Sequence, residues 1–119
     1  MTTVQSYREL IAWQKAMDLV VQTYCVTRGW PRDELYGLTN QVRRASVSVP
    51  ANIAEGQGRS STKEFLHHLS IAHGSLREVE THLLISQRLG YTDEPACNVV
   101  LGQASEVGRI LQGLMKSLQ

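Results

Sequence analysis

The 119-residue sequence lacks the features that would indicate a disulfide framework, a membrane span or an exported protein. Cysteine occurs only at Cys25 and Cys97, too few for a disulfide scaffold and without the paired spacing of a zinc site. No uncharged apolar run reaches the roughly 18 residues of a membrane span. The first twenty residues include Arg8, Lys15 and Asp18, so they lack the apolar core of a signal peptide. We therefore expect both cysteines to be reduced, buried thiols, with no membrane association and a cytoplasmic location.

The sequence also lacks an excess of charge of either sign. Twelve Lys and Arg residues stand against eleven Asp and Glu residues, which gives a net charge of +1. Such a balance does not by itself indicate nucleic-acid binding. Hydrophobic residues make up 42% of the chain and charged residues 19%, as in globular proteins. A chain of this length builds one core, so we predict a single domain over residues 1–119.

What the sequence does contain is apolar residues spaced three and four apart, which predicts four amphipathic helices and no sheet. Helix one ends before Gly29, which suits a left-handed cap, and Pro31 suits the start of helix two. The predicted core stripes are Leu10, Trp13, Met17, Val20 and Tyr24 in helix one; Leu35, Leu38, Val42, Ala45 and Val49 in helix two; Phe65, Leu69, Ala72, Leu76, Val79 and Leu83 in helix three; and Val100, Ala104, Val107, Leu111, Leu114 and Leu118 in helix four.

Residues 45–49 alternate small apolar residues with serine, which is also typical of a short strand. We favour a helix, because the apolar stripe enters from Leu35 and Ile53 and Ala54 continue it after Pro50. Pro50 removes a backbone donor and is expected to bend this helix.

Capping residues predict where the last two helices begin. Ser61 followed by Glu64 has the spacing of a capping box, so helix three should start there and run for roughly 28 residues, until Leu89 and Gly90. Thr92 and Asp93, with Pro95 just after them, predict the start of helix four. Asp33 and Glu34 are expected near the start of helix two, where acidic residues suit the helix dipole.

Short connections predict an all-α, antiparallel up-down-up-down four-helix bundle with helix two kinked at its proline. More apolar residues lie off the core stripes than one such core needs, which predicts contacts between protomers in a closed ring, or alternatively a broad core face within one chain. These residues are Ile11, Val21, Leu66, Ile71, Leu84, Ile85, Val99 and Ile110.

No pattern for catalysis, metal binding or a cofactor is complete. Glu64 and His67 match half of a di-iron carboxylate motif, but no second Glu-x-x-His pair is present. The segment at 56–61, GQGRSS, follows a helix and lacks the Gly-Lys-Ser/Thr of a phosphate loop. His68, Ser75 and His82 are seven residues apart and could form a polar seam, or remain solvated. We predict no catalytic residues, no metal, no cofactor and no small-molecule substrate.

The central segment carries a local basic excess. Residues 41–63 have a net charge of +3, and their basic residues are Arg43, Arg44, Arg59 and Lys63. Together with the amides at the start of helix three, these side chains are candidates for binding nucleic-acid phosphates. The alternative is that they only solvate helix surfaces or pair with acidic neighbours. Trp30, Tyr36 and Tyr91 are the aromatic residues near turns that could stack on bases.

The residues of three segments resemble a known family. They are YRELIAWQKAMDLV, LYGLTNQVRRASVSVPANIAEGQGRSSTKEF and LSIAHGSLREVETHLLISQRLGY, within residues 7–92. The chain is similar to the four helix bundle protein family, also called the 23S rRNA intervening sequence protein family. More distantly it resembles the accessory variability determinants of diversity-generating retroelements, which are more basic, form pentameric rings and work with a reverse transcriptase and RNA.

The resemblance implies a small bacterial cytosolic protein with a four-helix bundle protomer and a homopentameric ring, and it maps no catalytic residue onto this chain. We therefore expect a non-enzymatic scaffold that binds RNA or an RNA-protein partner through a basic surface repeated by symmetry. The alternative is a protein-protein interaction module with no nucleic-acid role.

Overall fold

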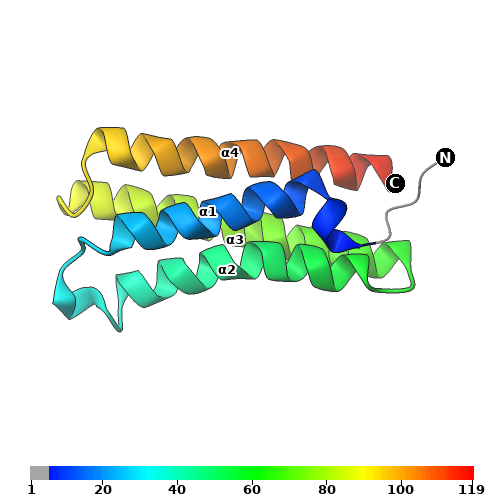
Figure 1. The fold of residues 1–119 in the computed structure, drawn as a ribbon, viewed down its shortest axis with the longest axis horizontal. Coiled ribbons are helices and arrows are strands. Elements are labelled where there is room, and N and C mark those ends of the chain that lie inside the picture. The colour runs from blue at the N-terminus through cyan, green and yellow to red at the C-terminus, as the bar shows by residue number, and fades with distance from the viewer. Residues whose placement is uncertain (1–5) are drawn as a thin grey trace.

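The computed structural model describes residues 6–119 and contains four long helices (Figure 1). These are α1 (Ile11–Thr27), α2 (Leu38–Gln57), α3 (Thr62–Arg88) and α4 (Glu94–Ser117), with two short 3₁₀ turns, η1 (Tyr7–Glu9) and η2 (Arg32–Glu34). Residues 6–119 include no strand, which confirms the all-α prediction. Residues 1–5 of the predicted domain lie outside the described part.

Each long helix packs against two others. The contacting pairs are α1 with α2, α2 with α3, α3 with α4, and α4 with α1. In Figure 1, α1 and α3 run toward one end of the molecule and α2 and α4 return. The α1–α2 and α3–α4 connections therefore share one end, while the α2–α3 turn and the C-terminus share the other (Figure 1).

The boundaries of α3 and α4 agree with the capping signals. The Ser61 hydroxyl accepts a hydrogen bond from the Glu64 amide at 3.1 Å. The Asp93 carboxylate accepts one from the Ala96 amide at 2.9 Å. These caps satisfy amides that have no partner within the helix. Just beyond the end of α3, Gly90 has φ +79°, a left-handed conformation that favours glycine.

The connection between α1 and α2 differs from the prediction. Gly29 does not adopt the left-handed conformation; among residues 6–119, Gly90 is the only glycine with a positive φ. Residues Arg32–Glu34 form the separate turn η2, and α2 begins only at Leu38. The Glu34 carboxylate accepts a hydrogen bond from the Leu38 amide at 3.2 Å, so this acid does lie at the start of α2.

Helix α2 is continuous through residues 45–54, so the preference for a helix over a strand is confirmed. Pro50 is buried inside it, and a bend at this residue stays a prediction. Near its end α2 approaches α3 closely, since a Cβ atom added to Gly56 would lie 2.7 Å from the Cβ of His68.

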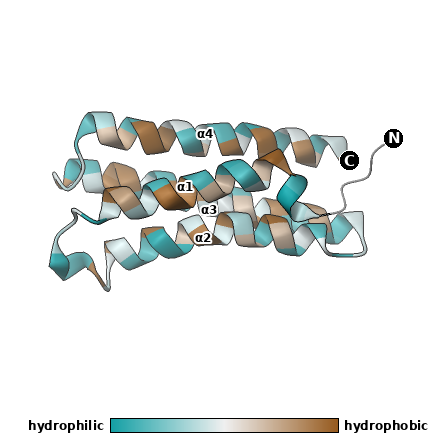
Figure 2. Cartoon of the chain, viewed as in Figure 1, coloured by the Kyte–Doolittle hydropathy of each residue, from teal (hydrophilic) through white to brown (hydrophobic). Residues whose placement is uncertain are grey.

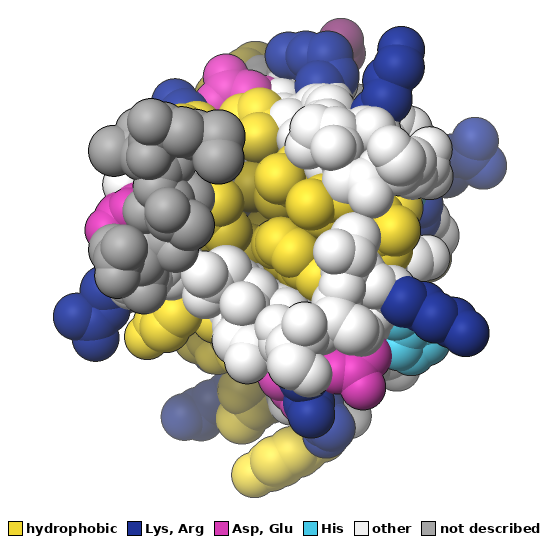
Figure 3. All heavy atoms as spheres, turned by 90° about the vertical axis from the view of Figure 1, so that its right-hand side faces the viewer, with side chains coloured by type: hydrophobic (Ala, Val, Ile, Leu, Met, Phe, Trp, Pro, Cys, Tyr) yellow, Lys and Arg dark blue, Asp and Glu magenta, His cyan; other side chains and the backbone are white. Residues whose placement is uncertain are grey.

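The predicted core stripes of α3 and α4 form the core, with their outermost members only partly buried. Figure 2 shows hydrophobic segments along all four helices, and in the end-on view of Figure 3 hydrophobic side chains gather at the centre, with Lys and Arg at the rim. In α2, Leu35 lies outside the helix and is 47% exposed, in contrast to the prediction. The buried hydrophobic residues are Val42, Ala45, Val49 and Ile53 in α2; Leu69, Ala72, Leu76, Val79 and Leu83 in α3; and Cys97, Val100, Ala104, Val107 and Leu111 in α4.

The predicted core stripe of α1 is only partly correct, because Leu10 and Trp13 pack against the core whereas Met17 and Tyr24 do not. Met17 is 40% exposed and Tyr24 is 37% exposed, and Trp13 is only half-buried. The buried face of α1 lies roughly a quarter turn away on the helix. It consists of Ala12, Ala16, Leu19, Thr23 and Thr27. Cys25 lies off this face and is exposed, in contrast to the expected buried thiol, whereas Cys97 is buried as expected.

Candidate nucleic-acid interface

The structure does not bring the four predicted basic residues together. Arg43 and Arg44 lie near the start of α2, whereas Arg59 and Lys63 flank the α2–α3 turn at the opposite end of the molecule (Figure 1). Glu55, which pairs with Arg59, lies twelve residues after Arg43, or about 18 Å further along the helix axis. These residues therefore form two separate basic regions.

The region at the α2–α3 turn is partly neutralised. The Arg59 guanidinium forms an ion pair with Glu55 at 2.7 Å. Lys63 is exposed in the first turn of α3, but one amide of that turn is already bonded to Ser61. Of the two basic residues at this turn, only Lys63 therefore has no salt bridge within residues 6–119.

Arg43 and Arg44 are adjacent in sequence but belong to different depressions. Arg44 lines a polar groove of about 430 Å³ between α2 and α3, which also contains Gln41 and Glu78. Arg43 lines a cavity of about 280 Å³ where α1, η2 and α2 meet. We call this second cavity the arginine pocket. It is lined by Thr27, Arg28, Trp30, Pro31, Arg32, Leu35, Thr39 and Arg43.

Three arginine residues and no acidic residue line the arginine pocket. Arg28 and Arg32 are exposed, and neither has a salt bridge within residues 6–119. Arginine presents several N–H donors in a fixed plane that matches phosphate and carboxylate oxygens. The arrangement is therefore suited to an anion.

Arg43 is held in place by α1. Its Nε donates a hydrogen bond to the Thr27 hydroxyl at 2.9 Å. Its guanidinium carbon lies 4.6 Å from the centroid of the Tyr24 ring, in range for a cation-π interaction. These contacts use Nε and one face of the guanidinium, so they fix the side chain while its terminal nitrogens remain donors.

A buried hydrogen-bonded group supports the wall of the pocket. Trp30 is 6% exposed, and its Nε1 donates to the Thr92 hydroxyl at 2.8 Å. The Tyr91 hydroxyl donates to the Glu34 carboxylate at 2.8 Å, and this bond raises the pKa of Tyr91 above its usual 10.0. Glu34 is thus engaged by Tyr91 and by the α2 cap.

Of the aromatic residues predicted near turns, Tyr36 alone is free to stack on a base. Trp30 and Tyr91 have the structural roles just described, whereas Tyr36 is 92% exposed. It directly follows Leu35, which lines the arginine pocket. An exposed ring beside phosphate-binding arginines is the combination that single-stranded nucleic-acid sites use.

Sequence reasoning missed Arg28 and Arg32. Both residues precede the basic segment 41–63 in the sequence. The signal was the short α1–α2 connection, because it folds residues 28–32 back against the first turns of α2. Charges on both sides of a short turn belong to one surface.

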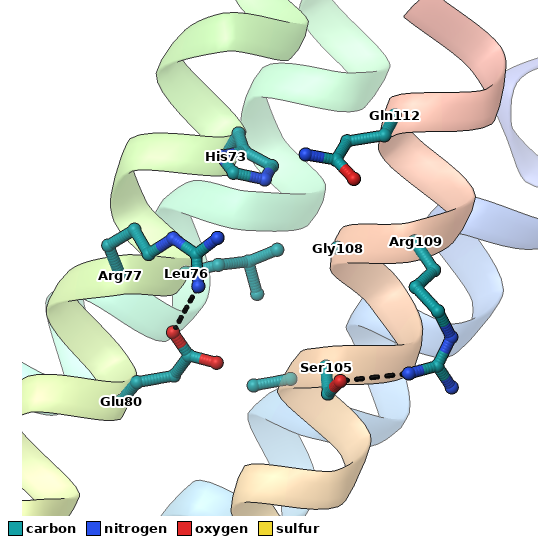
Figure 4. A pocket seen from close by; sticks show the side chains of 9 residues that line it. His73, Leu76, Arg77, Glu80, Ser105, Gly108, Arg109 and Gln112 are labelled. Carbon is teal, nitrogen blue, oxygen red and sulfur yellow. Dashed lines mark hydrogen bonds and ion pairs between the residues drawn. The ribbon is translucent and has the colours of Figure 1, made fainter.

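The pocket between α3 and α4 is smaller, and both of its arginines already have partners (Figure 4). It has a volume of about 110 Å³. Arg77 forms an ion pair with Glu80 at 2.9 Å, and Arg109 donates to the Ser105 hydroxyl at 2.9 Å (Figure 4). These groups have fewer free donors for an anion than the arginine pocket.

The polar seam predicted on α3 forms in part against α2. The Nδ1 atom of His68 lies 3.0 Å from Oδ1 of Asn52, and the Ser75 hydroxyl donates to Ser48 at 2.9 Å. The Nδ1 atom of His82 is buried with no hydrogen-bond partner in the described chain. Within residues 6–119, no three His, Cys, Asp or Glu side chains are grouped so that they could hold a metal ion.

No helix within residues 6–119 combines the length and the apolar character needed to cross a membrane.

The fold is similar to the crystal structure of a protein of unknown function from the S23 ribosomal protein family of Bacteroides thetaiotaomicron, with a TM-score of 0.80 and 21% sequence identity. The match covers 89% of this chain and 99% of that chain. No curated protein matches the sequence. The model of the family described as 23S rRNA-intervening sequence protein matches residues 8–113, which confirms the resemblance, and the chain belongs to this family.

Proposed function

We propose that this chain is a non-enzymatic, cytoplasmic RNA-binding scaffold, an up-down-up-down bundle with α2 bent at Pro50 that assembles as a homopentamer. Its ligand is RNA or an RNA-protein partner, bound through the arginine pocket. The observation that carries the proposal is the convergence of Arg28, Arg32 and Arg43 on one cavity without an acidic side chain in its lining. Tyr36 supplies a ring on which a base can stack.

A ring would multiply this weak site. One pocket contributes few phosphate contacts, in agreement with the net charge of only +1. Five copies of the pocket on one particle raise the effective concentration for each further contact on the same strand. The proposal therefore predicts weak binding to short RNA and tighter binding to RNA long enough to reach two pockets.

The test compares two double variants that remove the same charge. Arg28→Gln with Arg32→Gln changes the pocket, and Arg59→Gln with Lys63→Gln changes the opposite end. Binding of a fluorescently labelled single-stranded RNA is measured by anisotropy from about 50 to 200 mM salt. We expect the pocket variant to bind roughly tenfold more weakly with a shallower salt dependence, and the control variant to stay close to wild type.

Circular dichroism and native mass spectrometry then show that both variants keep their helicity and assembly. Equal losses in the two variants would indicate diffuse electrostatic attraction and would contradict the pocket. Unchanged binding in the pocket variant, or no RNA binding by the wild type, would also contradict it.

A second candidate function is a protein-protein interaction module with no nucleic-acid role. Apolar exposure favours it, since Ile85 on α3 and Leu89 just after its end are 41% and 54% exposed. Capture from a lysate treated with nuclease separates the two functions, because a protein partner of this kind stays bound after nuclease and in high salt, whereas RNA-mediated capture is lost.

A further inference from the structure

The arginine pocket is a recess that extends below the surface of the molecule. Three of the residues that line it, Thr27, Trp30 and Thr39, are only 2%, 6% and 3% exposed. A flat cluster of arginines would be lined by exposed side chains alone. The volume of about 280 Å³ is just below the range of roughly 300 to 1,000 Å³ that drug-sized ligands occupy. The recess therefore suits a ligand group of about the size of one phosphate and its sugar.

The wall that contains Arg32 is held by the other connection at this end of the bundle. Before η2, the Trp30 indole donates to the Thr92 hydroxyl at 2.8 Å. At the end of η2, the Glu34 carboxylate accepts a hydrogen bond from the Tyr91 hydroxyl at 2.8 Å. Both partners belong to the α3–α4 connection, which shares this end with the α1–α2 connection (Figure 1). The backbone of Arg32 is therefore fixed on both sides.

Arg43 is fixed independently on the facing element, α2. Its Nε atom is bonded to the Thr27 hydroxyl, and its guanidinium lies over the Tyr24 ring. The pocket is thus built before a ligand arrives. A site whose donors are positioned in advance binds the ligand that matches them at a lower entropic cost than one that has to be ordered on binding.

The acidic residues of η2 do not line the pocket. Asp33 and Glu34 both belong to this turn, and neither is part of the lining. The carboxylate of Glu34 already accepts hydrogen bonds from Tyr91 and from the Leu38 amide. Three arginines therefore share one recess, and like charges at close range repel. A ligand with two negative charges offsets this repulsion better than a ligand with one.

We infer that the arginine pocket binds the terminal phosphate of an RNA strand, a phosphate monoester, in preference to an internal phosphodiester. The inference names the ligand group of the proposed site and rests on the proposed function. A phosphate monoester carries about −1.5 to −2 charge at neutral pH and has three oxygens that accept hydrogen bonds. An internal phosphodiester carries one negative charge and has two such oxygens. Its strand must also enter and leave the site, whereas a strand end only enters a recess.

Tyr36 is placed to contact the base of the same terminal nucleotide. Its ring is 92% exposed, and it directly follows Leu35, which lines the pocket. Because consecutive Cα atoms are about 3.8 Å apart, the ring is within reach of a nucleotide whose phosphate lies in the recess. Stacking on such a ring tolerates any base, so the site reads the strand end without reading its sequence.

Fluorescence anisotropy with three RNAs tests the inference. The RNAs share one sequence with an internal fluorescent base and, at about five nucleotides, are short enough to favour a single pocket. They carry a 5′-phosphate, a 3′-phosphate, or hydroxyl groups at both ends. We expect the wild type to bind one or both phosphorylated RNAs about tenfold more tightly than the hydroxyl RNA, because the monoester adds charge-assisted hydrogen bonds. The two phosphorylated RNAs show which end the pocket accepts.

Two double variants that remove the same charge locate the preference. Arg28→Gln with Arg32→Gln should bind the three RNAs with nearly equal affinity. Arg59→Gln with Lys63→Gln, at the opposite end of the molecule, should keep the preference of the wild type. Circular dichroism shows that both variants are folded.

Equal affinity of the wild type for the three RNAs would overturn the inference. A preference that survives in the pocket variant, or that disappears in the control variant, would also overturn it, because the terminal phosphate would then be bound elsewhere or attracted by net charge alone. If the three RNAs bind equally and the pocket variant binds all of them more weakly, internal phosphodiesters are the ligand and the proposed function stands. If the wild type binds no RNA of any length, the proposed function fails as well.

Discussion

Helices α1 and α3 have equally clear apolar patterns and use them in opposite ways. In α3 the stripe with the largest apolar side chains is the buried one, and Leu69 and Leu83 are completely buried. In α1, Met17 and Tyr24 are exposed and Trp13 is only half-buried, whereas the fully buried positions are occupied by Ala12, Ala16 and Leu19.

The difference shows that the spacing of apolar residues alone does not identify which face of a helix packs on the core. Both stripes obey the same spacing of three and four. Side-chain size differs between the two buried faces: Ala12 and Ala16 in the first half of α1 allow close approach of the neighbouring helices, whereas leucines fill the space beside α3.

The largest expected effect is in α3, where adjacent leucines differ in burial. Leu83 is 0% exposed and Leu84 is 49% exposed. Leu83→Ala should lower the free energy of unfolding by about 2 to 5 kcal/mol, because it removes core contacts and leaves a cavity. Leu84→Ala should cost less than about 1 kcal/mol. Urea unfolding of both variants measures the difference, and similar losses would contradict the assigned faces of α3.

The second test enlarges the inner face of α1. Ala16 is 0% exposed, so Ala16→Leu should lower the free energy of unfolding by about 1 to 3 kcal/mol through overpacking. Met17→Leu, the next residue, keeps the side-chain volume on the outer face and should change it by less than about 0.5 kcal/mol. Thermal and urea unfolding at equal protein concentration measure both variants. A stable Ala16→Leu variant would mean that the core beside α1 is not closely packed.

The fold was predictable where local chemistry decides it. Ser61 and Asp93 cap their helices through side-chain hydrogen bonds a few residues long, so the sequence contains the whole signal. Gly29 shows the limit of such reasoning: glycine permits a left-handed residue without requiring one, and here only Gly90 adopts it.

The candidate site was predictable only in part, because its members come from three elements. Arg43 was identified within a basic segment, but its neighbour Arg44 belongs to another groove. Arg28 and Arg32 join Arg43 only after the α1–α2 connection folds back. The net charge of a sequence segment carries no information about this tertiary proximity. It also counts Arg59 equally with Arg43, although Arg59 pairs with Glu55.

The smallest expected effect concerns the flank of α3 that faces α2. His82 is half-buried there, and burial lowers the pKa of its imidazole below the usual 6.5, while the Glu78 carboxylate acts in the opposite direction. The folded chain therefore disfavours the protonated ring, and the unfolded chain binds more protons below about pH 6.5. The free energy of unfolding should fall as the pH falls through this range.

His82→Gln removes this contribution, whereas His67→Gln, at an exposed position of the same helix, serves as the control. Urea unfolding between about pH 7.5 and 5.5 should show a smaller loss of stability in His82→Gln than in the wild type or the control. Equal losses in all three proteins would mean that His82 is as well solvated in the folded chain as in the unfolded one. A smaller loss only in His82→Gln would instead show that the α2 flank of α3 excludes water, in contrast to the outer face of α1 in a single copy.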